Sequence, residues 1–221
     1  MATSSRRTAR GPRGRSTRVP KIYQARAQRT VHALLAAAAE VFSKNGFDTT
    51  QTPDIAQAAG VSVGTFYRYF SDKRAIFIEV ISRELERTHA EVMAKLLPAR
   101  FGAHAERRES IAQALAIVFD HIAGAARLMR VLEEVALRDS VVAKLRRKFE
   151  DETRAPIAAL IAEVTTRTEV PDPEATACVL HTAVIGTAVA QSGAHGKPPI
   201  ARDRALRALT DLVYRACFTD R

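Results

Sequence analysis

The fold is decided by the stretch TPDIAQAAGVSVGTFYRYF, from Thr52 to Phe70. Gly60 lies between its two halves, where a sharp turn requires a positive φ. Thr52 before Pro53 and Ser62 are suitable N-caps for two short helices. The apolar residues have the spacing expected if these helices share one small core; they are Ile55, Ala59, Val61, Phe66 and Tyr69. The stretch therefore predicts a helix-turn-helix, a unit that reads DNA.

Positions on both sides of this stretch agree, at fixed spacing, with one known family. They are Gly46, Phe47, Thr50, Asp54, Ile55, Ala56, Ala59, Gly60, Val61, Ser62, Gly64, Thr65, Tyr67, Tyr69, Phe70 and Lys73. Together they resemble the N-terminal domain of the TetR (tetracycline-repressor-like) family. The resemblance implies an all-α fold, with a three-helix DNA-binding domain before a larger helical domain for effector binding and dimerisation. We expect residues 1–24 to form a basic arm, 25–71 the DNA-binding domain and 72–221 the second domain.

The remaining sequence reads as helices throughout, without an alternating strand pattern. Ser71 is the expected N-cap of the helix that follows the helix-turn-helix. Pro156 should kink or split the helix that contains it. The predicted helices span about 25–44, 72–97, 106–125, 126–138, 140–168, 172–193 and 199–218.

Positive charge is concentrated at the N-terminus. The net charge is +10, and nine of the first thirty residues are basic while none is acidic. The Gly, Pro, Ser and Arg content of residues 1–24 predicts a disordered arm. The arm can follow phosphates or enter the minor groove, or it can be a solubilising tail that adds only non-specific affinity.

The predicted DNA contacts lie in and around the helix-turn-helix. They are Thr50, Thr52, Ser62, Val63, Gly64, Thr65, Tyr67, Arg68, Tyr69 and Lys73. The resemblance and the capping geometry imply phosphate contacts for Thr50, Ser62, Tyr67, Tyr69 and Lys73. We expect Thr65 and Arg68 to read base edges, although Arg68 could be another phosphate contact, and Val63 with the open Gly64 surface to meet a thymine methyl. Val63 departs from the family, which often has a basic residue there.

The resemblance also implies an effector pocket in the C-terminal domain. Candidate pocket residues are polar groups among apolar helical neighbours, with possible apolar walls beside them. They are Phe119, Asp120, His121, Met129, Phe149, His181, Ile185 and Gln191. Each polar one of these can instead be a hydrogen-bonded structural residue.

The last two predicted helices are the expected homodimer surface. The first of them has a face of small residues that permits close approach: Ala175, Cys178 or Val179, Thr182 or Ala183, Gly186 and Ala190. The second offers Leu206, Leu209, Leu212, Val213, Ala216 and Cys217. Two such pairs would form an intermolecular four-helix bundle, as the resemblance also implies. The alternative is an ordinary hairpin inside one chain.

The sequence lacks the motifs that are typical of several function classes. No nucleophile motif, paired-carboxylate pattern or phosphate-binding glycine loop is present, which argues against an enzyme, and we expect no metal and no cofactor. Cys178 and Cys217 are far apart and are expected to be buried, reduced thiols of a cytoplasmic protein. No apolar run approaches the ~20 residues of a membrane span.

From the helix-turn-helix and the family resemblance we expect a ligand-responsive repressor that binds a pseudo-palindromic operator as a homodimer. The alternatives are an effector-independent, nucleoid-type basic DNA-binding protein and an all-helical enzyme.

Overall fold

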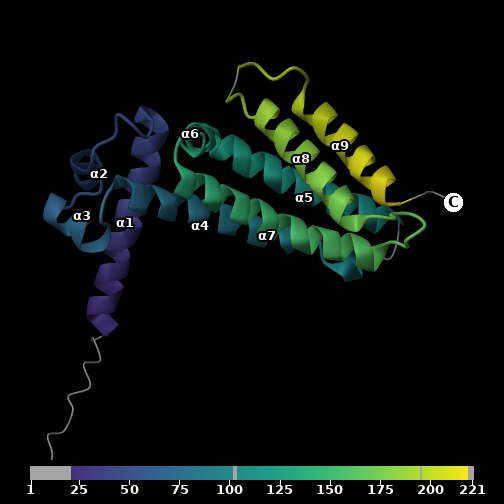
Figure 1. The fold of residues 1–221 in the computed structure, drawn as a ribbon, viewed down its shortest axis with the longest axis horizontal. Helices are drawn as coiled ribbons and strands as arrows, with labels where there is room; N and C mark the ends of the chain where they lie inside the picture. Colours follow the sequence, from purple (N-terminus) through teal and green to yellow (C-terminus); the bar gives the residue numbers. More distant parts are fainter. Residues whose placement is uncertain (1–20, 102–103, 195, 219–221) are drawn as a thin grey trace, which may run out of the picture.

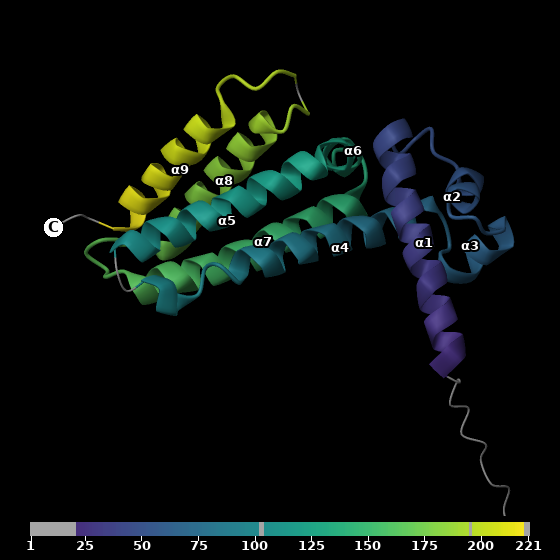
Figure 2. The same ribbon diagram turned by 180° about the vertical axis from the view of Figure 1, so that it is seen from behind.

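The computed structural model describes residues 21–101, 104–194 and 196–218. Within these ranges the chain forms nine α-helices and one short 3-10 helix, and no strand. This confirms the all-α expectation. Figure 1 shows an elongated molecule, with a small helical head at one end and a longer helical body that extends away from it. The view from behind, in Figure 2, shows the same separation of head and body.

The head consists of α1 (Lys21–Asn45), α2 (Thr52–Ala58) and α3 (Val63–Tyr69). Helix α1 begins before the predicted residue 25, because residues 21–24 continue the helix instead of belonging to the arm. The rest of the predicted arm, residues 1–20, lies outside the described residues. Gly46 ends α1 with a φ of 80°, a conformation that glycine adopts without steric cost. Phe47 then folds back and stacks on Phe42, with ring centroids 5.7 Å apart.

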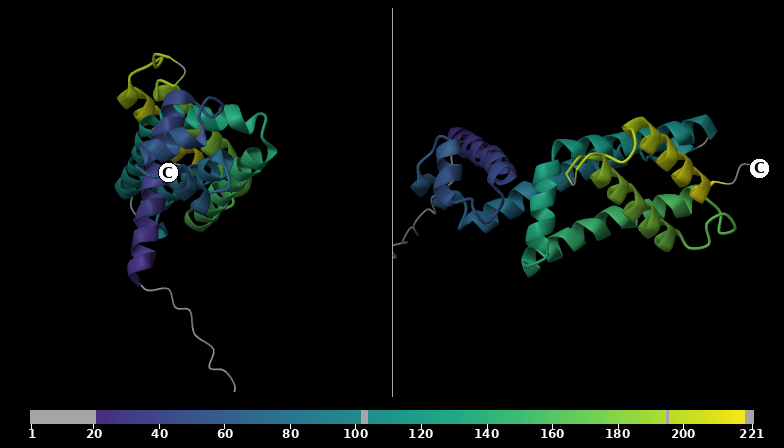
Figure 3. Two further views of the ribbon diagram at one scale, coloured as in Figure 1. Left: turned by 90° about the vertical axis from the view of Figure 1, so that its left-hand side faces the viewer. Right: turned by 90° about the horizontal axis from the view of Figure 1, so that it is seen from above.

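Helix α4 (Lys73–Met93) leaves the head and runs into the body. The body continues through a 3-10 turn, Pro98–Phe101, and the helices α5 (His104–Gly124), α6 (Ala126–Ala136), α7 (Ser140–Val164), α8 (Pro173–Gln191) and α9 (Arg202–Cys217). The second view in Figure 3 shows α6 lying across the end of the body that faces the head. The short helix α6 is thus in contact with α1 of the head.

One sequence prediction about the body helices is wrong, and one of the two outcomes expected at Pro156, a split helix, does not occur. Asp72, not Ser71, is the N-cap of α4, because its carboxylate accepts a hydrogen bond from the Ala75 amide at 2.8 Å. Helix α7 continues through Pro156 without a break. Proline removes one backbone donor there, while Ala158 and the next turn are buried in the core and hold the helix in place.

The hydrophobic core has two parts. One fills the body. The other begins in the head and extends into α4, α6 and the start of α7; its fully or nearly fully buried members are Leu34, Leu35, Ala38, Phe42, Ile55, Ala56, Phe66, Ile76, Phe77, Val80, Ile81, Leu128, Val131, Leu132, Val135 and Val142. The boundary that the sequence places at residue 71 therefore divides a single core.

Helix α9 packs mainly inside its own chain. Leu209 and Cys217 are buried in the body core, and Leu206, Val213 and Ala216 pack against it. The apolar stripe of α9 therefore faces the body, as an ordinary hairpin requires, and only Leu212 of the six predicted interface residues is more than half-exposed, at 51%. The small-residue face of α8 is different. Its exposed members are Ala175, Cys178, Val179, Thr182, Gly186 and Ala190. Exposed Cys178 corrects the expectation of two buried thiols; both cysteines are free.

Candidate DNA-binding surface and effector cavity

The turn between α2 and α3 has the geometry that its sequence predicts. Gly60 adopts a φ of 67°, and the Val61 amide donates to the Ala56 carbonyl at 3.0 Å. The Ser62 hydroxyl caps α3 by accepting a hydrogen bond from the Thr65 amide at 3.1 Å. The hydroxyl groups of Ser62 and Thr65 are themselves 2.9 Å apart. The start of the reading helix is therefore fixed by this pair.

Helix α3 buries one face and exposes the other. Phe66 is fully buried, whereas Val63 is 39% and Tyr67 is 53% exposed. Arg68 is also exposed, and within the described part of the chain no hydrogen bond or ion pair occupies its guanidinium. A Cβ added at Gly64 would meet only the Ser62 hydroxyl, at 3.8 Å. The exposed face thus carries one unengaged cation and an open surface, as a base-reading helix needs.

Helix α2 starts differently from its prediction. Its N-cap is Gln51, whose backbone amide donates a hydrogen bond to the Asp54 carboxylate at 2.8 Å. Thr52 is therefore the first helical residue and not the cap. Pro53 is tolerated in this first turn because the amide that it lacks would have no partner inside the helix. The Thr52 hydroxyl instead lies 3.0 Å from the Tyr67 hydroxyl, so it fixes the side chain of a predicted phosphate contact.

Two predicted phosphate contacts have structural roles in the head. Thr50 is fully buried, and its hydroxyl donates to the Gly46 carbonyl at 2.6 Å. The ammonium of Lys73 donates to the carbonyls of Phe47, Asp48 and Thr50, each at 2.9 Å. It also lies 4.9 Å from the centre of the Phe47 ring. Lys73 therefore ties α4 to the α1–α2 connection, and its three donors are not available to a phosphate.

Arg68→Ala is expected to change the sequence preference of DNA binding, whereas Tyr67→Phe should weaken binding to all sequences alike. A base-reading arginine contributes about 1–3 kcal/mol of discrimination at one base pair, and a phosphate contact contributes none. Titration of operators with single base changes, at one salt concentration, measures the difference. If Arg68→Ala lowers every affinity equally and reduces the log K versus log salt slope by about 0.9, Arg68 is a phosphate contact.

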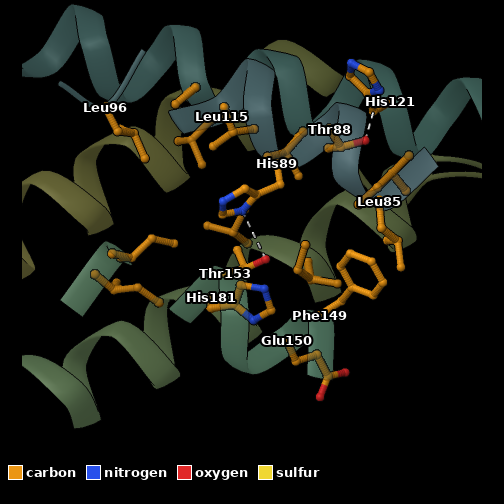
Figure 4. Close-up of a pocket in the computed structure, with 18 of the residues that line it drawn as sticks. Leu85, Thr88, His89, Leu96, Leu115, His121, Phe149, Glu150, Thr153 and His181 are labelled. Carbon is orange, nitrogen blue, oxygen red and sulfur yellow. Dashed lines mark hydrogen bonds between the residues drawn. The ribbon is translucent and has the colours of Figure 1, made fainter. Parts of the chain in front are cut away.

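A cavity of about 290 Å³ lies inside the body, with lining residues on α4 to α9. Its walls are mainly aliphatic and aromatic, as is usual for small-molecule sites. Polar groups enter it at a few points, and Figure 4 shows three of them, His89, Thr153 and His181, close together between apolar walls. His89 Nδ1 and Thr153 Oγ1 are 3.5 Å apart. The cavity is a candidate effector site.

Five of the eight residues predicted for the effector pocket line this cavity: His121, Met129, Phe149, His181 and Ile185. The other three lie outside it. Phe119 is buried in the body core on another side of α5. Asp120 pairs at the surface with Arg202, at 2.6 Å. Gln191 is the last residue of α8 and is not part of the lining.

The sequence prediction missed two polar lining residues, His89 and Thr153, that a further signal could have identified. His89 occupies an inward position of the α4 stripe, between Leu85 and Val92, and Thr153 does the same in α7, between Phe149 and Ile157. A polar residue at an inward position must find a partner or face a cavity. That rule distinguishes His89 and Thr153 from polar residues on the solvent-facing sides of the same helices.

Burial affects two titratable groups of the cavity wall. Burial, and secondly the charge of Arg154, lower the pKa of His181, so its imidazole is neutral near pH 7. Burial raises the pKa of Cys217 to about 11, which leaves an unreactive thiol. His121 bridges α4 and α5 on the opposite side, with Nδ1 3.0 Å from the Thr88 hydroxyl and Nε2 2.8 Å from the Glu91 carboxylate. Its ring therefore has a structural partner at each nitrogen.

Two ion pairs join the corner between α6 and α7 to the head. Arg138 pairs with Asp48 in the α1–α2 connection, and Asp139 pairs with Arg74 in the first turn of α4. The Asp139 carboxylate also caps α7, because it accepts the amides of Val141 and Val142 at 2.9 and 3.1 Å. The hydrogen bond from Arg74 lowers the pKa of Asp139. This corner therefore fixes the head against the body.

Asp139→Ala is expected to destabilise the protein by about 1 kcal/mol more than Asp139→Asn, because asparagine still caps the helix and alanine does not. The lowered pKa of Asp139 means that its charge stabilises the fold above the usual carboxyl pKa of about 3.9 and loses this effect as pH falls through the folded-state value. Urea unfolding of both variants between pH 3 and 7 measures the two effects. Asp203→Asn, which removes an exposed ion pair on α9, is the control. Equal losses in the two Asp139 variants would contradict the capping role.

Residues 34–80 match the family described as bacterial regulatory proteins of the tetR family. The HTH-type transcriptional repressor KstR of Mycolicibacterium smegmatis is 39% identical over 58 residues, which are 26% of this chain and 28% of that relative. The fatty acid metabolism regulator protein of Bacillus subtilis is 30% identical over 122 residues, which are 53% of this chain and 57% of that one. These matches thus cover about a quarter to a little over half of the curated relatives.

The fold also matches solved structures over most of the chain. A putative TetR-family transcriptional regulator from Mesorhizobium loti aligns with a TM-score of 0.70 at 20% identity, covering 86% of this chain and 96% of that one. At this identity the likeness shows the fold alone. The residues matched by the tetR family are, however, those that build the head. The head of this chain therefore matches the tetR family of bacterial regulatory proteins, and the described chain has the fold of a solved TetR-family structure.

Proposed function

We propose that this regulator is a ligand-responsive repressor. It binds a pseudo-palindromic operator as a homodimer, through the exposed face of α3, and a small molecule in the body cavity releases it. The relative KstR, named as a transcriptional repressor, favours repression over activation. In this proposal the protein works in the cytoplasm and is not an enzyme.

The observation that carries the proposal is the position of α6 between the cavity and the head. Met129 and Leu132 line the cavity, and the same two side chains belong to or pack against the core that continues into the head. A ligand that displaces either side chain must therefore shift packing against α1 and α4. An effector-independent DNA-binding protein would not need a cavity whose wall is shared in this way.

The homodimer is proposed to form through the exposed small-residue face of α8, with Leu212 of α9 beside it. Among the described residues α8 is the helix that is long and apolar enough to cross a membrane by length and composition alone. Its exposed Val179, 67% accessible, and the small residues on the same face allow close helix packing. A second copy would cover this apolar face, and we assign no membrane partner to it.

Release by a ligand requires two conformational states with different affinities for it. In the DNA-binding state the two heads of the dimer are about 34–36 Å apart, or a modest distance beyond, and enter successive major grooves. The ligand is proposed to favour another separation of the heads. Because α6 contacts both the cavity and the head, its displacement is the step that links ligand binding in the cavity to the separation of the heads.

Footprinting on the DNA upstream of its own gene tests the proposal. Two protected half-sites related by two-fold symmetry are expected, with a specificity ratio well above that of a non-specific binder. Release of this complex in an effector screen would complete the test. Protection of one isolated half-site by a monomer would overturn the homodimer, and a ligand that binds the cavity tightly without changing DNA affinity would overturn the coupling.

A further inference from the structure

We propose that the cavity ligand is an elongated, uncharged apolar molecule that carries one hydroxyl or carbonyl oxygen, bound by His89, Thr153 and His181. This inference rests on the proposed function, since it names the chemical class of the effector. These three side chains, the neutral polar cluster, come from α4, α7 and α8. Figure 4 shows them facing one another across the middle of the cavity.

The shape of the cavity favours an extended ligand. In Figure 4, Leu96 and Leu115 lie on one side of the neutral polar cluster, and Leu85 and Phe149 lie on the other. Along α7 the apolar lining continues from Thr153 through Ile157, Leu160 and Ile161 to Val164. At 1.5 Å per residue this length is about 16 Å. An alkyl chain advances roughly 1.3 Å per carbon, so about a dozen carbon atoms fit along it.

The charges of the wall argue against an anionic ligand. Three glutamates line the described cavity, and Arg146 is its only arginine or lysine. The Arg146 guanidinium already pairs with Glu150 at 2.9 Å. A buried carboxylate in the ligand would therefore have no free counter-charge, and burying an ion without one costs several kcal/mol.

A cationic head group is disfavoured at the neutral polar cluster for a different reason. Burial and the charge of Arg154 lower the pKa of His181, although the charge of Glu150 acts in the opposite direction. The same desolvation and the same charge would act on a ligand cation placed beside it. The three lining glutamates are also engaged: Glu84 pairs with Arg87 at 2.7 Å, Glu150 pairs with Arg146 at 2.9 Å, and Glu133 has a partner as well. The His181 imidazole and the Thr153 hydroxyl can instead both donate to and accept from an uncharged oxygen.

The hydrogen-bond capacity of the neutral polar cluster is incompletely used. The contact of 3.5 Å between His89 Nδ1 and Thr153 Oγ1 is at the limit of a hydrogen bond. A ligand oxygen between these side chains would satisfy groups that otherwise face an apolar space. A ligand that fills the cavity displaces water from these polar groups, and a desolvated polar group without a partner is costly; ligands that carry one such oxygen are therefore favoured over those that carry none.

Isothermal titration calorimetry of the full chain tests the ligand class. Octan-1-ol is expected to bind at least about tenfold more tightly than octanoate or octyltrimethylammonium. Within the series from hexan-1-ol to tetradecan-1-ol, affinity should rise about fourfold per methylene and stop rising near the length that the cavity accepts. Equal or tighter binding of either ion, or an affinity that does not depend on chain length, would overturn the proposal.

Matched valine variants test the site. Thr153→Val keeps the shape and removes the hydroxyl, so it should weaken octan-1-ol binding about fivefold and leave 1-chlorooctane nearly unaffected; Thr153→Ser should restore the alcohol affinity. Thr187→Val is the control, because Thr187 is a half-buried α8 residue outside the cavity lining, and its hydroxyl donates to the Ala183 carbonyl of the same helix at 2.7 Å. Equal losses in both valine variants would overturn the assignment.

Operator release in the same samples separates the two proposals. If octan-1-ol binds as expected and DNA affinity does not change, the proposed repressor mechanism fails while the ligand class stands. If a charged molecule binds the cavity and releases the DNA while the alcohols do not bind, the ligand class fails and the repressor mechanism stands.

Discussion

Lys73→Met is expected to destabilise the head by about 3 kcal/mol. The ammonium loses three hydrogen bonds to backbone carbonyls at 2.9 Å and its contact with the Phe47 ring, while methionine preserves most of the apolar stem. Hydrogen bonds to charged groups contribute about 1.5–3 kcal/mol each and are not additive. Urea unfolding followed by circular dichroism measures the loss.

Lys44→Met, at an exposed position of α1, is the matched control and should change stability by less than about 1 kcal/mol. DNA binding gives an independent readout under conditions where the variant is folded. A structural Lys73 leaves the log K versus log salt slope unchanged, whereas a lost phosphate contact lowers it by about 0.9. A stable variant with the lower slope would restore Lys73 to the DNA surface.

Leu132→Ala is expected to weaken the link between ligand binding and operator release, in addition to destabilising the protein by about 2–5 kcal/mol. Leu132 is 5% exposed and is shared by the cavity wall and the head core. Truncating it leaves space in which a displaced α6 can move without pushing on the head. Because allosteric coupling amounts to about 1–3 kcal/mol, we expect the ligand-induced change in operator affinity to fall at least threefold.

Leu160→Ala provides the matched comparison for this effect. Leu160 is also buried and lines the same cavity, but it belongs to the body core. The Leu160→Ala variant should lower the stability of the protein and its affinity for the ligand. It should not change the ratio between the operator affinity without ligand and the operator affinity at saturating ligand. If both variants reduce that ratio equally, coupling does not pass through α6 in particular.

The head could be predicted from the sequence because its signals are local. Gly60, the Ser62 cap and buried Phe66 each depend on neighbours within a few residues. The role of Lys73 could not be read in this way, since its acceptors are carbonyls 23 to 26 residues earlier in the chain. A carbonyl has no residue-type signature, so a lysine that binds three of them resembles a free cation in the sequence.

The body cavity was harder to predict, because helical periodicity identifies one face of a helix and does not identify what lies opposite that face. Asp120 and His121 are adjacent in sequence, yet only His121 lines the cavity while Asp120 pairs at the surface. Likewise α9 has a clear apolar stripe, but a stripe does not reveal whether it meets its own α5 or another subunit. These choices depend on tertiary packing, which single-helix patterns do not contain.

The core shared by head and body limits how this regulator can be recombined with others. Residues 21–72 alone would lose the buried side chains that α4 and α6 contribute, among them Phe77, Val131 and Val135. A hybrid made by joining this head to a foreign effector domain after α3 would therefore expose the underside of its DNA-binding unit. Transferable specificity requires a larger cassette, in which α4, α6 and the start of α7 travel with the head or are redesigned to fit it.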